Sequence, residues 1–155
     1  MEAVDFIGRL FFDSMMDESR SFAKANHEME NDEKFQAFLN EHNLNDQRSS
    51  LVVFGPENFV YWYGVVVPHG SISDLAGLMK FELPKAEVAT ETQDGNISSL
   101  DLPLNHEIPA FLKKLTDKGI EVYENLGDSD TPYVLTTADT AEKKLTQVLY
   151  LKVSD

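Results

Sequence analysis

The predicted elements of this chain follow one order twice: strand, helix, strand, strand. This repetition restricts the fold more than any other feature of the sequence. The first series covers about residues 4–83, the second covers about residues 86–153, and residues 84–85 separate them. Because each half would expose one face of its sheet, the other half can cover that face. The sequence therefore predicts a single domain over residues 1–155, of the α+β class.

The spacing of equivalent residues supports the repeat. Aligning the penultimate strand of each half places Tyr61 opposite Tyr133, 72 positions apart, and aligning the last strands places Met79 opposite Leu149, 70 positions apart. Two offsets this similar indicate a duplicated β-α-β-β unit.

The strands are predicted from short runs of β-branched and aromatic residues that glycine, proline or polar clusters interrupt. They cover residues 4–12, 51–54, 59–67, 78–83, 86–92, 121–123, 133–137 and 145–153. Gly8 inside the first strand suggests a β-bulge. Residues 13–30 are mostly polar and acidic, and they fit either a connecting loop or an early helical turn.

Two helices are predicted from apolar residues that recur three and four positions apart. A first helix over residues 32–42 places three apolar side chains on one face. These are Phe35, Phe38 and Leu39. A second helix covers residues 104–115, with Asn105 as its N-cap and Gly119 after its end. Pro109 is compatible with this helix only near the first turn.

The charge of the chain excludes most direct binding to nucleic acids. It has 27 acidic residues against 13 Lys and Arg, a formal net charge of −14, whereas phosphate backbones are held by clustered Lys and Arg. An anionic membrane surface is disfavoured for the same reason. We therefore expect neither nucleic acid nor membrane among the partners.

Cysteine is absent, which excludes disulfides, thiolate catalysis and cysteine-ligated metal centres. The histidines also lack the spacing of a metal site, so we expect neither a metal nor a cofactor. They are His27, His42, His69 and His106. The N-terminus is acidic and no run approaches the roughly 20 apolar residues of a spanning helix, which predicts a cytoplasmic protein.

The repeated pattern resembles the GyrI-like small-molecule-binding domain, the effector-binding domain of bacterial multidrug-responsive transcription activators. Four passages carry the resemblance and together extend over nearly the whole chain. They are residues 60–64, 79–89, 111–119 and 148–153. The resemblance implies a stand-alone domain with one curved, mostly antiparallel sheet. Two helices are then expected on one face of the sheet and an aromatic cleft on the other.

Members of this family bind bulky hydrophobic compounds, often cations, in that cleft, and an acidic residue of the second half meets the ligand's charge. In this chain Val134 lies at or beside the expected acid, so the usual route to cation selectivity is missing. Glu82 is the best substitute, because its apolar neighbours are expected to face the helices and to turn it toward the cleft. The alternative is that Lys80 or Lys152 pairs with Glu82 in a surface ion pair.

The strand predicted at residues 59–67 has apolar side chains on both faces, so a ligand, a loop or a partner must cover the second face. We expect six residues to form the ligand site. They are Tyr61, Trp62, Tyr63, Glu82, Tyr133 and Tyr150. A tyrosine or tryptophan ring stacked against a cation contributes about 0.5–2 kcal/mol. For each aromatic residue, ordinary core packing is the alternative.

Three functions follow, in order of preference. The first is non-enzymatic binding or sensing of a hydrophobic small molecule, cationic ones included. The second is a protein–protein interaction, including gyrase inhibition, in which the acidic surface would complement a basic partner. The third is hydrolysis of reactive hydrophobic compounds, which ranks last because the usual acid is replaced and no catalytic residue is assigned.

Overall fold

The computed structural model describes residues 1–154 and has the expected α+β class. Its strands are β1 (Val4–Phe12), β2 (Gln47–Phe54), β3 (Phe59–Pro68), β4 (Met79–Leu83), β5 (Ala86–Asp94), β6 (Tyr133–Asp139) and β7 (Lys144–Val153). Its α-helices are α1 (Ala23–Glu30), α2 (Glu33–Glu41) and α3 (Leu104–Asp117). Short 3-10 helices are η1 (Asp13–Met15), η2 (Ile97–Asp101) and η3 (Leu126–Asp128).

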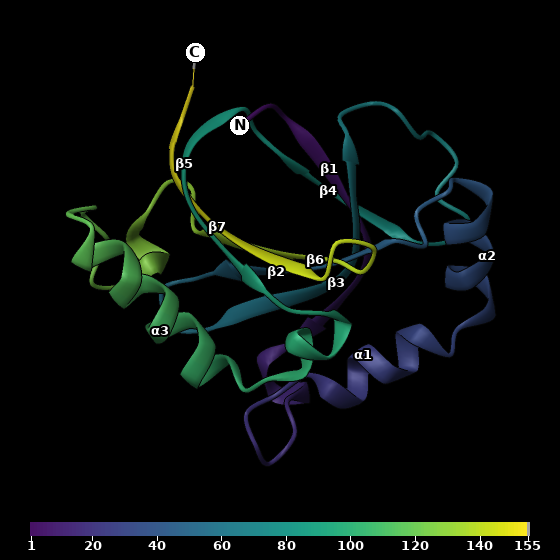
Figure 1. Ribbon diagram of the computed structural model, residues 1–155, viewed down its shortest axis with the longest axis horizontal. Coiled ribbons are helices and arrows are strands. Elements are labelled where there is room, and N and C mark those ends of the chain that lie inside the picture. The colour runs from purple at the N-terminus through teal and green to yellow at the C-terminus, as the bar shows by residue number, and fades with distance from the viewer. Residues whose placement is uncertain (155) are drawn as a thin grey trace.

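All seven strands form one antiparallel sheet in the order β4-β1-β3-β2-β6-β7-β5. The sheet curves strongly without closing (Figure 1). Its central pair is β2 and β6, in which Val52 lies opposite Val134. Outward from this pair, β3 and then β1 follow on one side, and β7 and then β5 follow on the other.

This order differs from the alignment that predicted the repeat. β6 corresponds in position to β2, since both are central, whereas β3 corresponds to β7. Tyr61 of β3 and Tyr133 of β6 therefore lie in strands that are not equivalent in the sheet. Met79 of the edge strand β4 and Leu149 of β7 are not equivalent either. The duplication stays a prediction, and it would have to match β2 with β6.

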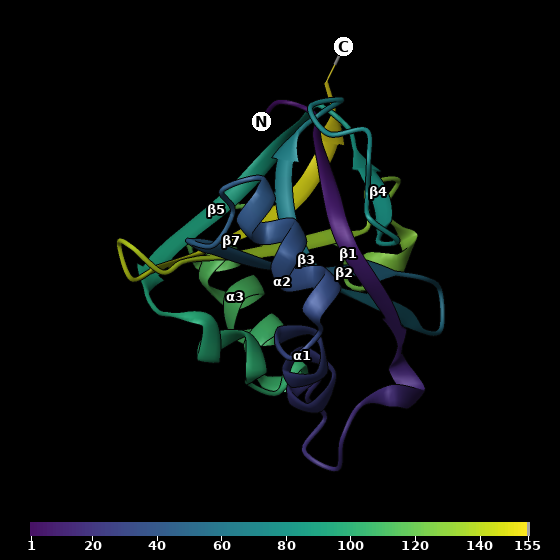
Figure 2. The ribbon, with the colours of Figure 1, turned by 90° about the vertical axis from the view of Figure 1, so that its right-hand side faces the viewer.

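The helices cover one face of the sheet, which we call the outer face (Figure 2). Phe35 and Phe38 of α2 belong to the same buried cluster as Tyr63 of β3. Phe111 of α3 belongs to a second cluster with Leu149 of β7. Both clusters lie on the same face, because side chains alternate along the strands that contribute to them.

The opposite face, which we call the inner face, carries an apolar cluster although no α-helix among residues 1–154 packs on it. The curvature of the sheet buries this cluster, and Phe6 and Leu51 are fully buried within it. Gly8 and Gly64 lie opposite each other in the β1–β3 pair. A side chain on either glycine would meet the backbone of the other strand. The two glycines therefore allow β1 and β3 to approach closely where the sheet bends.

The edge strands β4 and β5 are consecutive in the chain, and only Pro84 and Lys85 connect them. The N-terminus lies against this connection. The Met1 ammonium group donates to the Ala86 carbonyl at 2.8 Å, and the Ala86 N–H donates to the Met1 carbonyl at 3.0 Å. Backbone hydrogen bonds thus fix one corner of the curved sheet.

Both predicted helices are confirmed, as α2 and α3. Asp32 caps α2 by accepting hydrogen bonds from the N–H groups of its first turn. Asn105 is not the cap of α3, which begins at Leu104 behind Pro103, and Pro109 lies inside the helix. Residues 13–30, for which the sequence left loop and helix as alternatives, contain η1 and α1, so residues 1–154 form three α-helices rather than the two expected.

Seven predicted strands are confirmed, with shifted ends, and the strand at 121–123 is wrong because those residues form no strand. The β-bulge expected at Gly8 is also wrong. β1 pairs with β3 in unbroken register. The irregularity lies instead in the β5–β7 pair, where Leu151 of β7 is an extra residue between the partners of Glu87 and Val88. Among residues 1–154, none of the helices combines the length and apolarity needed to cross a bilayer.

Candidate functional site

A row of five aromatic side chains crosses the inner face, each ring meeting the next edge to face. The centroid distances are 6.1 Å for Phe6–Trp62, 5.7 Å for Trp62–Phe81, 5.5 Å for Phe81–Tyr133 and 5.6 Å for Tyr133–Tyr150. Phe81 comes from the edge strand β4, and Tyr133 comes from the central strand β6. The curvature of the sheet brings these rings together, and each such pair contributes about 0.5–1.5 kcal/mol.

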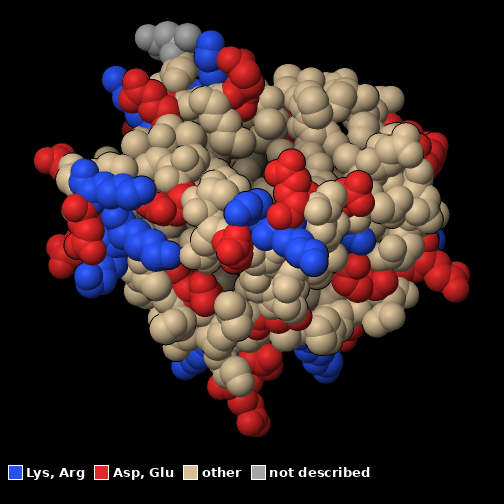
Figure 3. Space-filling view, viewed as in Figure 1, with Lys and Arg blue, Asp and Glu red and all other residues tan. Residues whose placement is uncertain are grey.

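This row contains three of the six predicted site residues: Trp62, Tyr133 and Tyr150. Trp62 is 5% exposed and Tyr150 is 2% exposed, so contacts within the protein already cover most of their surface. Tyr133 is half-buried. Figure 3 shows a hollow on the inner side of the sheet, between β5 and the β1–β4 edge. The inner face is therefore partly filled by its own rings and partly open.

Tyr61 and Tyr63 do not line the inner face, where the cleft was expected. Side chains alternate along β3, so these two face the helices while Trp62 faces inward. Tyr61 stacks on Phe22 with 4.1 Å between centroids, and its hydroxyl donates to Asn26 Oδ1 at 2.7 Å. Burial raises the pKa of both phenols. Both tyrosines are core residues.

Glu82 also lies on the outer face, which reverses the predicted orientation. Its neighbours Phe81 and Leu83 belong to the inner cluster instead of facing the helices. The Glu82 side chain is 61% exposed and forms an ion pair with Lys80, with 3.4 Å between the ammonium nitrogen and Oε1. Glu82 therefore supplies no charge to the aromatic row. Val134, at the position expected for the family's acid, is buried in the cluster beneath α3.

A pocket of about 450 Å³ opens on the outer face, between the start of α3 and the ends of β2 and β3. We call it the α3 pocket. Its lining consists of Met16, Arg20, Val52, Phe54, Phe59, Leu104, Asn105, Ile108 and Pro109. Pockets that bind small molecules typically measure about 300–1,000 Å³ and are mainly apolar. Because β2 and β3 lie before residues 84–85 and α3 lies after them, both halves of the chain contribute to the pocket lining.

The backbone holds the walls of this pocket in place. The Leu104 N–H donates to the Arg20 carbonyl at 3.1 Å, which ties the start of α3 to the turn before α1. The Arg20 N–H in turn donates to the Asp17 carbonyl at 3.1 Å. Pro109 has no N–H, so the Asn105 carbonyl lacks its usual helical donor. The start of α3, which lines the pocket, is thus tied by a backbone hydrogen bond to the segment before α1.

Arg20 determines the charge of the α3 pocket. It is the only charged residue among the described residues of the lining, and it is exposed. A guanidinium group pairs with carboxylates, sulfonates and phosphates through two parallel hydrogen bonds. This lining therefore favours an anionic group over a cation.

No family model and no curated protein matches this chain. The resemblance to GyrI-like domains stays a prediction that rests on the four passages of sequence. The α3 pocket and the aromatic row are the features from which a function is inferred.

The α3 pocket was not predicted from the sequence. Phe54 and Phe59 lay at the ends of predicted strands, where they resembled ordinary core residues. Arg20 lay in a segment whose structure was left open. Pro109 was the one available signal, because a proline beyond the first turn of a helix removes a backbone donor.

Tyr150 allows the burial of the aromatic row to be measured. Burial, together with nearby Tyr133, raises the pKa of the Tyr150 hydroxyl from 10.0 to about 12. The raised pKa means that burying the neutral Tyr150 hydroxyl adds to the free energy of unfolding. This addition is complete below pH 10 and is lost as the pH rises to 12. Between pH 10 and 12, the free energy of unfolding should therefore fall less steeply in Tyr150→Phe than in the wild type, by about 1.4 kcal/mol per pH unit.

Urea unfolding at successive pH values measures this change. Tyr123→Phe is the matched control, because Tyr123 is 55% exposed, and it should leave the slope unchanged. If the free energy of unfolding falls with pH at the same rate in Tyr150→Phe and in the wild type, Tyr150 is not buried as described.

Proposed function

We propose that this protein binds a small apolar molecule with an anionic group, and that the binding site is the α3 pocket. One observation carries the proposal: a pocket of about 450 Å³ with aromatic and aliphatic walls has a single charged residue, Arg20, in its described lining. The proposal keeps the predicted class of function, non-enzymatic binding of a hydrophobic compound. It changes the location of the site and the charge of the ligand.

The apolar part of the ligand would contact Phe54, Phe59 and Ile108. These side chains are only half-buried, so they retain apolar surface that a ligand can cover. Each Å² of apolar surface removed from water contributes about 25 cal/mol. A ligand with a fused or paired ring system would gain most of its affinity from this wall.

The anionic group of the ligand would pair with the Arg20 guanidinium group. A charge-assisted hydrogen bond contributes about 1.5–3 kcal/mol. The exposed position of Arg20 favours the lower end of this range, which corresponds to about a tenfold change in affinity.

The aromatic row is a weaker candidate for the ligand site. Its rings pack on one another, and Trp62 and Tyr150 have little surface left to offer. Glu82, which was expected to attract a cation there, lies on the other face of the sheet. The row therefore resembles a core that the curved sheet encloses.

Two fluorescent probes with the same aromatic body test the proposal. Anilinonaphthalene sulfonate carries an anionic group and phenylnaphthylamine does not. We expect the wild type to bind both saturably, with one site each. Arg20→Gln should weaken sulfonate binding about tenfold and leave the neutral probe unchanged, because only the sulfonate pairs with the guanidinium. Ile108→Trp should weaken both, because it narrows the pocket.

Arg9→Gln is the matched control for the loss of one positive charge. Arg9 pairs with Asp32 at 3.0 Å and does not line the α3 pocket, so this variant should bind both probes as the wild type does. Failure of both probes to bind, or binding that neither Arg20→Gln nor Ile108→Trp weakens, would refute the proposed site. The protein-interaction and hydrolase functions stay predictions from the sequence.

A further inference from the structure

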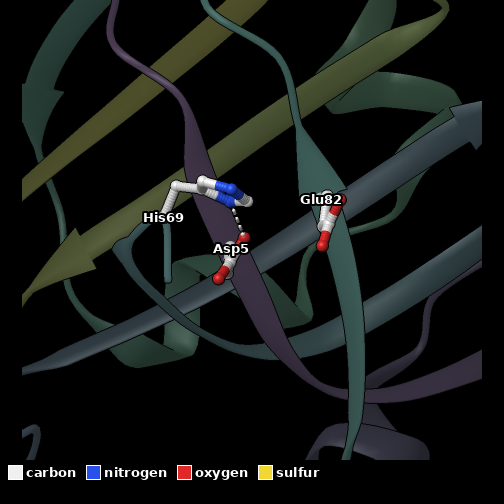
Figure 4. Close-up of side chains that lie close together, drawn as sticks. All are labelled: Asp5, His69 and Glu82. Carbon is white, nitrogen blue, oxygen red and sulfur yellow. Dashed lines mark hydrogen bonds and ion pairs between the residues drawn. The ribbon is translucent and has the colours of Figure 1, made fainter. Parts of the chain in front are cut away.

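Three potential metal ligands from distant parts of the chain meet on the outer face, away from the α3 pocket. Figure 4 shows Asp5 of β1, His69 of the turn after β3 and Glu82 of β4 pointing toward one another. One ligand atom from each residue lies within 4.8 Å of the others. The cluster therefore brings one imidazole and two carboxylates into a single small volume.

The strand register is the reason these carboxylates meet. Asp5 lies directly opposite Glu82 in the antiparallel β1–β4 pair. Like charges at directly opposite positions destabilise a sheet, and the cost increases when a carboxylate leaves water. The Asp5 side chain is 0% exposed. Such an arrangement requires positive charge or hydrogen-bond donors close by.

The surrounding residues supply this compensation in the present structure. His69 Nδ1 lies 2.8 Å from Asp5 Oδ1, and the Gly70 N–H donates to Asp5 Oδ2 at 2.9 Å. Lys80 pairs with Glu82 from the same strand. Burial alone raises the pKa of Asp5. The Gly70 N–H, His69 and Lys80 together outweigh burial and hold the pKa of that carboxyl below its usual value. These contacts hold the Asp5 carboxylate in a fixed orientation, with Oδ1 toward His69 and Oδ2 toward Gly70.

We propose that Asp5, His69 and Glu82 form a zinc-binding site, and that Lys80 occupies the cation's place when zinc is absent. Zinc binds imidazole nitrogen and carboxylate oxygen at about 2.0–2.2 Å, and the donors of a tetrahedral site are then about 3.4 Å apart. The present separations reach this geometry with small side-chain rotations. His69 and Glu82 are free to make them, since their side chains are 53% and 61% exposed.

The ligand set selects among metals. Magnesium and calcium prefer oxygen ligands alone, whereas an imidazole favours zinc and its transition-metal neighbours. Zinc between His69 and Asp5 replaces the proton that joins Nδ1 to Oδ1, and that proton leaves to solvent. Exposure of the site leaves a fourth position open to water. The net charge of −14 raises the local concentration of cations at the surface.

Competition with a chromophoric zinc indicator at neutral pH tests the site. The full chain should bind one zinc ion, and magnesium at the same concentration should not compete. His69→Ala and Glu82→Gln should each weaken zinc binding by ~10–100-fold, the loss seen when a metal site is disrupted. Lys80→Gln should strengthen binding by about fivefold, because it removes a competing ammonium group from Glu82.

His27→Ala is the matched control. His27 pairs with Asp101 at 3.1 Å on another part of the surface, and its loss should leave zinc affinity unchanged. Wild-type affinity in both His69→Ala and Glu82→Gln would overturn the proposal, and so would weaker binding in Lys80→Gln. Far-UV circular dichroism checks folding. Should His69→Ala be unfolded, the opposite changes expected for Glu82→Gln and Lys80→Gln still decide the outcome.

Discussion

Replacing Gly64 with alanine is expected to destabilise the protein by about 3 kcal/mol, at the upper end for a single overpacked position. The added Cβ would overlap the Ile7 carbonyl oxygen of the neighbouring strand and lie 2.7 Å from Gly8 Cα. These are backbone atoms, which cannot rotate away as a flexible side chain would. The close approach of β1 and β3, and with it the bend of the sheet, depends on the absence of this one carbon atom.

Urea unfolding measures the effect, and Gly77→Ala is the matched control. Gly77 has φ +84° with no atom within 4 Å of an added Cβ, so its substitution tests backbone strain without overlap and should cost about 1–2 kcal/mol. A Gly64→Ala protein as stable as Gly77→Ala, or more stable, would show that the two strands do not approach as described.

Glu30→Leu is the second change with a large expected effect, a loss of about 3–5 kcal/mol. Glu30 at the end of α1 accepts two hydrogen bonds from Arg48 of β2, from Nε at 2.8 Å and from Nη2 at 3.2 Å. The Tyr63 hydroxyl donates to the same carboxylate at 2.8 Å. The Arg48 side chain is only 6% exposed. Removing Glu30 would therefore leave a buried guanidinium group without its counter-charge.

Two further variants separate the charge from the hydrogen bond. Tyr63→Phe removes one donor and keeps the ion pair, so it should cost only about 1 kcal/mol. Adding Arg48→Met to Glu30→Leu removes the stranded charge and should recover about half of the lost stability. A loss below about 1 kcal/mol for Glu30→Leu, measured by urea unfolding, would mean that the pair is well solvated.

The elements predicted correctly are those whose pattern is local. The helix at α2 follows from apolar residues three and four apart and from the cap at Asp32. The strand at β3 follows from its run of aromatic and β-branched residues. β2 was predicted too short because it begins with four polar residues, Gln47, Arg48, Ser49 and Ser50. They are strand residues because β6 pairs with all four of them and β3 pairs with Ser49 and Ser50, which periodicity cannot show.

The errors come from contacts between distant segments. Residues 121–123 have strand-like composition, but none of the described strands pairs with them, and Val122 instead packs against the cluster beneath α3. The orientation of Glu82 was reversed because the sequence gives no sign of which sheet face the curvature would bury. Phe81 and Leu83 face inward, into the cluster that the sheet encloses.

The candidate sites were harder to predict than the fold. Asp5 and His69 are 64 positions apart and meet because β1 pairs with β3, whereas Glu82 joins them because β1 also pairs with β4. No spacing rule for metal ligands covers such a separation. The α3 pocket likewise depends on how the start of α3 sits over β2 and β3. Of the six residues expected at one site, Trp62, Tyr133 and Tyr150 lie together on the inner face, whereas their role in binding stays a prediction.

Methyl-group NMR during titration with anilinonaphthalene sulfonate tests the central claim most directly, because it locates the bound molecule. The α3 pocket contributes methyl groups from Val52, Leu104 and Ile108, whereas the inner face contributes those of Val66 and Val148. We expect saturable shifts concentrated in the first group. Shifts confined to the second group would place the ligand over the aromatic row and contradict the assignment of the α3 pocket as the binding site.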